Sequence, residues 1–298
     1  MLSAARLNVL YLSSIKEIPS TAMMTILLPT DFRERSLNAC AYALGLFGTA
    51  GNTFLLVHTY QDPLPGYEML VEMSSAGYTE AVEDMADFVK RFRALPFAVD
   101  AVLVTEVVKG TMTTAVAGVC RSKGVNVLVM GTQGASALAL FGSNAAAMAV
   151  SSPVPVLIVP KDARYQGLRR ILLADDHAPM EPSEMHLLLE MARRTKAHIA
   201  VAHVLRSAGQ VADPQVIAAH EVVLTDVEHS FIEAAGDDVA LALSNLAERV
   251  GADLVAVLHR HMGFLGGLFH ASVARELAMH GRIPMLVLQY QATSSRRL

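Results

Sequence analysis

Three glycines, a serine and an asparagine, at Gly131, Gly134, Gly142, Ser143 and Asn144, have the types and spacing best suited to ligand binding in this chain. They follow an apolar run, and the pattern predicts a buried strand, a glycine-hinged loop and then a helix start. Glycine tolerates left-handed backbone angles and lets the main chain approach a ligand closely. The backbone N–H groups of a helix start lack intrahelical partners, and the helix dipole adds positive charge there. The segment therefore predicts a phosphate-binding site.

Each of these residues also has a purely structural interpretation. The first two glycines could form a tight strand-to-helix turn, and Ser143 could cap its own helix, which is worth about 1 kcal/mol. Asp31, at the end of an early strand, could accept hydrogen bonds from ribose hydroxyls or cap the helix that begins near Arg33. The glycine loop expected opposite Asp31 favours ribose. Val57 and Met130 would be apolar walls for a purine, although such residues, taken alone, are more often plain core.

Other candidate chemistry is less well supported. Ser143 has no evident His and Asp partners, and Cys40 and Cys120 lie in helical patterns, so no serine or cysteine hydrolase is predicted. No cysteine accompanies the histidines of the second half, and no acidic residue is expected at ligand spacing. We therefore predict no metal site and interpret these histidines as filling a degenerate pocket. They are His177, His203, His259, His261 and His270.

Composition excludes several classes of protein. The 298 residues are enough for two domains. Hydrophobic residues make up 53%, but no run approaches the roughly 20 needed to span a bilayer. The net charge of −4, with no block of lysines and arginines, argues against nucleic acid as a partner. The two cysteines are expected to be buried thiols, which fits a reducing, cytoplasmic compartment.

The sequence repeats itself, with four segments of the first half matched in the second. The offset between matched segments falls from 145 in the first two pairs to 127 in the third, and it is 129 in the last, so the second copy is shorter overall. Such matched blocks at both ends indicate a tandem duplication. The pairs are Ile26–Asp31 with Ile171–Asp176, Phe54–His58 with Ile199–His203, Gly124–Asn126 with Gly251–Asp253, and Pro155–Val159 with Pro284–Leu288.

Each copy alternates short apolar strands with helices, which predicts an α/β fold with a parallel sheet covered on both faces. We expect two tandem five-stranded parallel-sheet domains of the nucleotide-binding, Rossmann-like type. Right-handed crossovers place the first and fourth strands side by side, with a crevice at their carboxyl ends. In the first copy the predicted strands are 24–30, 53–60, 98–107, 125–130 and 154–160, and the predicted helices are 34–49, 67–94, 111–123 and 143–151.

The expected domain boundaries follow from the repeat. Residues 24–162 form the first domain, 168–291 the second, and 292–298 a tail. Residues 1–23 match nothing later in the chain and are interpreted as a disordered or adventitious leader. A signal peptide is the less favoured alternative, because Lys16 and Glu17 interrupt a short apolar patch.

The chain resembles the universal stress protein family, strongly over 24–160 and more weakly over 169–290. The resemblance rests on Pro29-Thr30-Asp31, Val57-His58, the loop of Gly131, Gly134 and Gly142-Ser143, and the closing strand 153–160. It implies ATP, with Mg²⁺, as the ligand. Asp31 would hold the ribose, Val57 the adenine, and the glycine loop the phosphates. The implied site comprises Pro29, Thr30, Asp31, Val57, Met130, Gly131, Gly134, Gly142, Ser143 and Asn144.

The sequence departs from the family pattern in two ways. Seven residues, 135–141, separate Gly134 from Gly142, where ATP-binding members have nine, so the phosphate loop would be drawn tighter. The second copy has Leu258, His261 and Ala271 where the first has its glycines. Side chains there would occupy the space of a phosphate. We therefore expect at most one nucleotide site, in the first domain, and a structural or regulatory task for the second.

Three functions remain open at this point. The favoured one is a cytoplasmic stress-response nucleotide-binding sensor or adaptor, with at most slow ATP hydrolysis because no general base is evident. The alternatives are a scaffold that binds no nucleotide, and a transferase or ligase, for which we find no catalytic motif. The resemblance also implies that the domains pair through their last strands, 154–159 and 283–288, as an intramolecular pseudo-dimer. A homodimer is a further possibility.

Overall fold

The computed structural model describes residues 23–61, 70–132, 143–205, 213–259 and 283–289. Several predictions fall on residues outside these ranges. They concern the leader up to residue 22, Gly134, Gly142, His261, His270, Ala271 and the tail.

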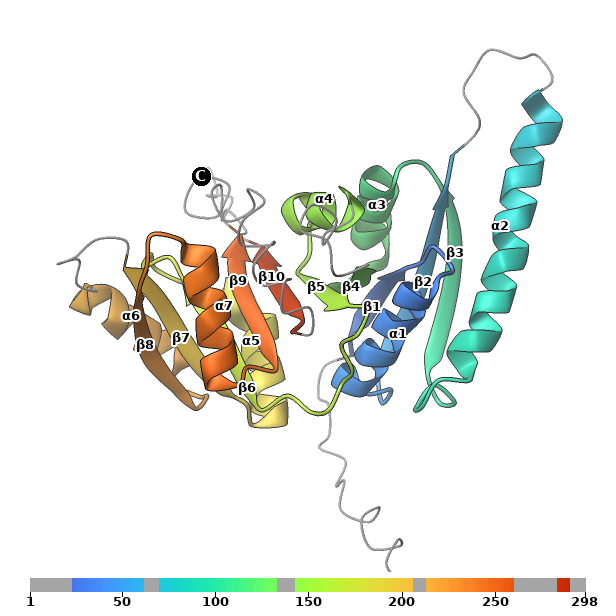
Figure 1. Cartoon of the computed structure of the whole chain (residues 1–298). Helices are drawn as coiled ribbons and strands as arrows, with labels where there is room; N and C mark the ends of the chain where they lie inside the picture. The colour runs from blue at the N-terminus through green and yellow to red at the C-terminus, as the bar shows by residue number, and fades with distance from the viewer. Residues whose placement is uncertain (1–22, 62–69, 133–142, 206–212, 260–282, 290–298) are drawn as a thin grey trace, which may run out of the picture.

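The chain forms the expected α/β fold, with strands and helices in strict alternation throughout the first half and from β6 to β9 in the second (Figure 1). The first half contains β1 (Thr25–Pro29), α1 (Glu34–Phe47), β2 (Thr53–Tyr60), α2 (Leu70–Arg93), β3 (Val102–Lys109), α3 (Met112–Lys123), β4 (Val127–Thr132), α4 (Ser143–Ser151) and β5 (Val156–Pro160). The second half contains β6 (Arg170–Asp175), α5 (Pro182–Thr195), β7 (His198–Leu205), α6 (Pro214–Leu224), β8 (His229–Ala235), α7 (Val239–Val250), β9 (Leu254–His259) and β10 (Met285–Gln289). No helix among the described residues has the length and apolar character needed to cross a membrane.

The third strand differs most from its prediction, because it begins at Val102 rather than near residue 98. The preceding residues form turns instead. Arg93, in the last turn of α2, donates hydrogen bonds to the carbonyl oxygens of Ala98 and Ala101, at 2.9 and 2.8 Å. Ala98 is also fully buried. This turn uses apolar residues that an alternating pattern would assign to a strand.

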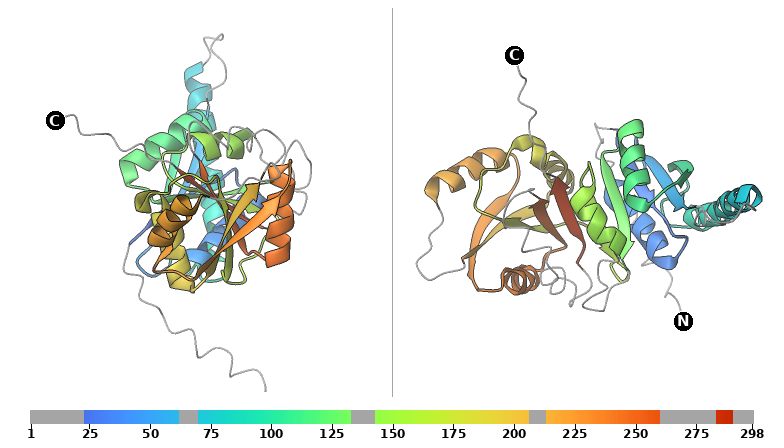
Figure 2. Two further views of the ribbon diagram at one scale, coloured as in Figure 1. Left: turned by 90° about the vertical axis from the view of Figure 1, so that its left-hand side faces the viewer. Right: turned by 90° about the horizontal axis from the view of Figure 1, so that it is seen from above.

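The ten strands form one continuous sheet in the order β3-β2-β1-β4-β5-β10-β9-β6-β7-β8. Within each half all pairings are parallel, and β1 lies between β2 and β4 as expected from right-handed crossovers. The halves join where β5 pairs with β10 in the antiparallel sense, with Leu286 opposite Leu157. Figure 2 shows the two halves side by side, with these strands between them.

Helices cover both faces of this sheet and bury nearly continuous apolar strands, which is typical of parallel sheets. Alternate residues of each strand enter two core clusters, one on each face. On one face the cluster includes side chains of α1, α2 and α5, such as Leu44, Phe88 and Leu188. On the other it includes side chains of α3, α4 and α7, such as Val116, Met148 and Leu243. Each cluster runs through both halves.

The pairing registers show which positions of the two halves are equivalent. Ile26 lies opposite Val127 in the first half, and Ile171 lies opposite Leu254 in the second. The offsets of 145 and 127 seen in the sequence therefore hold in three dimensions. Phe32 and His177, related by the first offset, even share the left-handed backbone conformation, with φ of 63° and 58°. The two halves can thus be compared residue by residue.

Candidate functional site

The first candidate site lies at the carboxyl ends of β1 and β4, where the chain turns to opposite sides of the sheet. From β1 it continues through α1 to β2, and from β4 it continues through α4 to β5 on the other side. Ligands of open α/β sheets bind outside the strands at such a switch point. Thr30 and Asp31 directly follow β1, and Gly131 and Thr132 end β4.

Asp31 is held in place by the start of α1. The Ser36 hydroxyl donates to Oδ1 at 2.6 Å, and the Arg33 amide donates to the same oxygen at 3.3 Å. Arg35 forms an ion pair with Oδ2. The helix itself has Arg33 at its N-cap position, with no side-chain cap, so Asp31 is not the N-cap. Its side chain is 32% exposed, so the carboxylate keeps a face toward solvent.

Pro29 and Thr30 are fixed mainly by their backbone. Pro29 pairs with Val57 in the parallel register, and the Thr30 amide donates to the Val57 carbonyl at 2.9 Å. Thr30 is buried, and its hydroxyl accepts the amide of Phe32 at 2.9 Å. These contacts set the path of the chain from β1 to Asp31.

Val57 and Met130 both lie on the face of the sheet covered by α3 and α4. Val57 is fully buried and Met130 is buried to 6% exposure. In this arrangement both are core residues, and neither offers the open surface that a purine wall requires.

Gly131 lies very close to another part of the protein backbone. A Cβ built on this residue would lie 2.2 Å from the carbonyl oxygen of Arg35 in α1. The absence of a side chain therefore lets the first turn of α1 pack against β4. Ser143 and Asn144 form the first turn of α4, as predicted, but their side chains lie outside what the structure describes.

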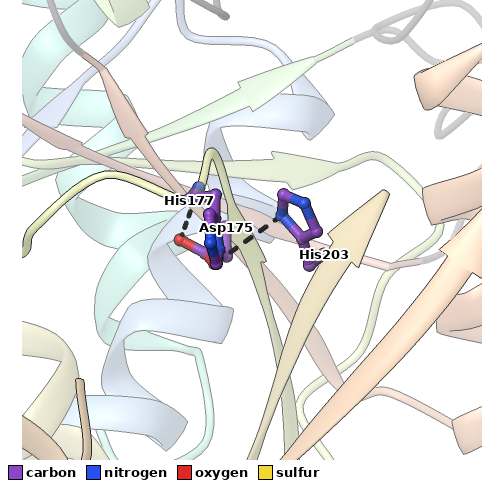
Figure 3. Close-up of side chains that lie close together, drawn as sticks. All are labelled: Asp175, His177 and His203. Carbon is purple, nitrogen blue, oxygen red and sulfur yellow. Dashed lines mark hydrogen bonds and ion pairs between the residues drawn. The ribbon is translucent and has the colours of Figure 1, made fainter. Parts of the chain in front are cut away.

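The equivalent corner of the second half contains a cluster that the sequence reasoning missed. Asp175 ends β6, His177 follows it in the loop, and His203 lies near the end of β7 (Figure 3). The Oδ2 atom of Asp175 lies 3.7 Å from Nδ1 of His177 and 3.8 Å from Nδ1 of His203. The imidazole rings of the two histidines are 4.5 Å apart. Three candidate metal-ligand atoms lie within 4.8 Å of one another.

Helix α6 completes this cluster. Its His220 is fully buried, with Nδ1 3.9 Å from the same Asp175 oxygen and Nε2 3.1 Å from the carbonyl oxygen of Ala178. The amide of Asp213, which caps this helix, donates to Nε2 of His177. Among the described residues, Nδ1 of His220 and both ring nitrogens of His203 have no hydrogen-bond partner.

Burial raises the pKa of the Asp175 carboxyl above its ordinary range. The neighbouring His220 and His203 and the hydrogen bond from the His177 amide, at 3.0 Å, oppose this effect.

The expectation that no acidic residue accompanies these histidines is wrong, because Asp175 lies among them. The signal was present in the repeat. Positions 30, 32 and 58 of the first half carry Thr, Phe and His, whereas their counterparts carry Asp, His and His. Asp175 and His203 are far apart in the sequence, but the parallel pairing of β6 with β7 places them side by side at one edge of the sheet. His259, by contrast, ends β9, and the other histidines proposed with it lie outside the described ranges.

Comparison with known proteins bears on both halves. The sequence model of the universal stress protein family matches the chain twice, over residues 23–160 and 167–289. A universal stress protein from Archaeoglobus fulgidus DSM 4304 superposes with a TM-score of 0.69 at 18% identity, covering 89% of this chain and 98% of that one. A functionally unknown protein from Pseudomonas aeruginosa PAO1 gives 0.54 at 15% identity, covering 90% and 93%. At these identities the likeness concerns the fold alone. None of the curated proteins matches the sequence.

Proposed function

The chain belongs to the universal stress protein family, as two tandem domains, and from this premise we propose that it is a cytoplasmic stress-response nucleotide-binding protein. It has at most one nucleotide site, in the first half, for a nucleotide of the ATP or AMP type, with Mg²⁺ accompanying ATP. The cytoplasmic placement rests on Cys40 and Cys120, which are buried free thiols of the kind kept in reducing compartments.

The observation that carries the nucleotide proposal is the position of Asp31 relative to α4. Asp31 follows β1 at the switch point, held by Ser36 and Arg35 with part of its carboxylate exposed. Helix α4 begins at Ser143 after the neighbouring strand, β4. A carboxylate that accepts ribose hydroxyls and a helix start that faces phosphate are the two parts a mononucleotide site of this fold needs.

The second half is a poorer candidate for a nucleotide. The registers place Leu258 at the position of Gly131, and its side chain is buried in the core. The loop that follows β6, residues 176–181, is longer than the loop 30–33 of the first half, and α5 begins correspondingly later. Asp175 lies close to His177 and His203, whereas its counterpart in the first half, Thr30, hydrogen-bonds to Phe32 and His58. These differences support a single nucleotide site.

Two observations favour a scaffold that binds no nucleotide. Both oxygens of the Asp31 carboxylate already have protein donors, and Val57 and Met130 are closed to solvent. A nucleotide would have to share the first group and find its purine contacts elsewhere along the same edge.

Binding can be measured directly. We expect purified protein to release nucleotide on denaturation, or to bind ATP in calorimetry, with the titration repeated with and without Mg²⁺. Asp31→Ala should weaken ATP binding by about 10- to 100-fold, since it removes a charged hydrogen-bond acceptor.

The duplicated chain supplies the matched control. Asp176→Ala, the same change at the equivalent position of the second half, should leave ATP affinity unchanged. Equal losses in both variants would argue against a site confined to the first half. No co-purified nucleotide and no heat with submillimolar ATP would favour the scaffold instead.

A further inference from the structure

We propose that Asp175, His177 and His203 form a binding site for a divalent transition-metal ion of the zinc type at the carboxyl edge of the second half. The proposal is independent of nucleotide binding in the first half. It rests on the donor set, the distances between donors, the unpartnered nitrogens and the contrast with the equivalent corner of the other repeat.

The Asp175 carboxylate lies at nearly the separation from each histidine that a metal imposes on its ligands. Zinc binds imidazole nitrogen at about 2.0–2.1 Å and carboxylate oxygen at about 2.0–2.2 Å, so two ligands of a tetrahedral ion lie about 3.4 Å apart. The Asp175 oxygen lies 3.7 and 3.8 Å from the nearest nitrogens of His177 and His203. These distances are too long for direct hydrogen bonds. These two distances exceed the roughly 3.4 Å separation by a few tenths of an ångström, and all three donor atoms lie within 4.8 Å of one another, so rotations of the side chains would bring them around one ion.

The chemistry of the donors fits such an ion. Two imidazoles and one carboxylate are ligands of zinc and of other first-row divalent metals, and three protein ligands leave a position for water or a substrate. Magnesium and calcium, which prefer all-oxygen sites, fit less well.

The unpartnered nitrogens provide a second, independent observation. Buried polar atoms normally have hydrogen-bond partners, and exceptions require an explanation. Within the described part of the chain, both ring nitrogens of His203 and Nδ1 of His220 have none. A metal ion bound at the cluster would give His203 the partner it otherwise lacks.

His220 acts as a positioning residue behind the ligands. Its Nε2 lies 3.1 Å from the Ala178 carbonyl, which fixes the ring proton on that nitrogen in the neutral form. Its Nδ1 lies 3.9 Å from the Asp175 carboxylate oxygen, so the buried ring limits where that carboxylate can lie.

His177 links the site to α6. Because its Nε2 accepts the Asp213 amide, the proton of the neutral ring lies on Nδ1. Coordination of a metal through Nδ1 requires that the proton be on Nε2 instead, and this breaks the hydrogen bond to Asp213, because two N–H groups would then face each other. Metal binding is therefore coupled to the N-terminus of the helix that also carries His220.

In the first half, the equivalent positions at the carboxyl ends of β1 and β2 lack the carboxylate and one of the two imidazoles. Phe32 stacks on His58 with ring centroids 4.3 Å apart, and Phe88 of α2 packs against Phe32 at 5.9 Å. His58 Nδ1 is bonded to the Thr30 carbonyl oxygen at 2.9 Å. An aromatic cluster in one repeat is replaced by a carboxylate with imidazoles in the other.

The test uses the full chain expressed without a polyhistidine tag. After equilibration with Zn²⁺ and gel filtration, elemental analysis should find one zinc per chain. Cobalt(II) in place of zinc should give the visible absorption of a low-symmetry nitrogen and oxygen site. Asp175→Asn and His203→Gln should each raise the dissociation constant for Zn²⁺ by more than about 100-fold, a larger loss than an outer-shell change causes.

Two control variants separate this site from other histidines. His58→Gln changes the equivalent residue of the first half, and His186→Gln changes an exposed residue of α5; both should retain zinc. His177→Phe copies the residue of the first half, so it should fold, as judged by circular dichroism, and lose the metal. Absence of zinc from the wild-type chain would overturn the proposal. So would zinc that survives Asp175→Asn, His203→Gln and His177→Phe in folded protein.

Discussion

At the scale of single residues, Gly131 shows why a motif glycine can have a structural origin. It lies at the end of β4, where the Arg35 carbonyl of α1 occupies the place of a side chain. The close approach lets Ser36 and Arg35 reach Asp31. The glycine thus positions the candidate ribose acceptor by controlling how a helix packs.

Gly131→Ala should therefore destabilise the fold by about 1–3 kcal/mol, because backbone atoms would have to move to admit the methyl group. Urea unfolding followed by circular dichroism measures this. Gly118→Ala is the matched control, since a Cβ there meets no atom within 4 Å and the residue lies inside helix α3. That variant should be neutral or more stable. A tolerated Gly131→Ala would mean that α1 does not depend on this contact.

The two thiols allow a second prediction at this scale. Burial raises the pKa of Cys120 to about 11 and that of Cys40 further still. Because the thiolate is the reactive form, alkylation of native protein near pH 8 should be much slower than that of unfolded protein and should accelerate as the pH rises. Mass spectrometry after timed iodoacetamide treatment gives the rates. Rapid labelling of folded protein would contradict the buried environment of either cysteine.

Residue roles were only partly predictable from sequence. The position of Asp31 at the carboxyl edge of the sheet was predictable, because a carboxylate directly follows an apolar strand in the sequence. The burial of Val57 and Met130 was not predictable, because their exposure depends on how tightly α3 and α4 pack on the sheet. The acidic partner of His177 and His203 was missed, because it is brought near them by parallel pairing of β6 with β7.

At the scale of elements, apolar periodicity predicted nearly all of the first half. Strands buried on both faces read as continuous apolar runs, and the helices between them have amphipathic spacing, so β2 and α4 were predicted with their observed bounds. The prediction for β3 was displaced, because a turn closed by Arg93 absorbs apolar residues that sequence pattern alone cannot distinguish from strand.

Strand β5 carries a prediction about how elements join. Val156 is fully buried and lies opposite both Leu128 of β4 and Val287 of β10. Val156→Lys would bury an unpaired charge, so we expect a loss of more than about 3 kcal/mol and expansion of the molecule in small-angle X-ray scattering.

The control for this change is Val104→Lys in β3, where the side chain is 41% exposed. It should alter stability by no more than about 0.5 kcal/mol. Unchanged melting and compactness of the Val156 variant would show that the two halves associate without this strand.

At the scale of the whole molecule, the halves also meet through helices. Arg194, near the end of α5, donates hydrogen bonds to the carbonyl oxygens of Leu46 and Phe47 in the last turn of α1, the latter at 2.8 Å. Its guanidinium lies 5.8 Å from the centre of the Phe47 ring. Helix ends leave such carbonyls without intrahelical partners, so a cation from the other half satisfies them.

Arg194→Ala should cost about 1.5–3 kcal/mol of stability, in line with hydrogen bonds from a charged donor. The neighbouring Arg193→Ala should cost at most about 1 kcal/mol, because Arg193 is exposed and pairs with Asp226 only at 3.5 Å. Paired chemical denaturation curves measure both. Similar losses would show that the contact between the helices contributes no more than a surface ion pair.

The contact at Arg194 has a consequence for how the two corners can communicate. Helix α1 begins beside Asp31 and α5 begins after the loop of His177, and both end at this contact. A ligand that shifts either helix changes the free energy of the contact. Thermodynamic linkage then makes the effect reciprocal, so the factor by which zinc alters ATP affinity must equal the factor by which ATP alters zinc affinity. Titrating ATP into zinc-loaded and zinc-free chains gives that factor, and Arg194→Ala should bring it to one.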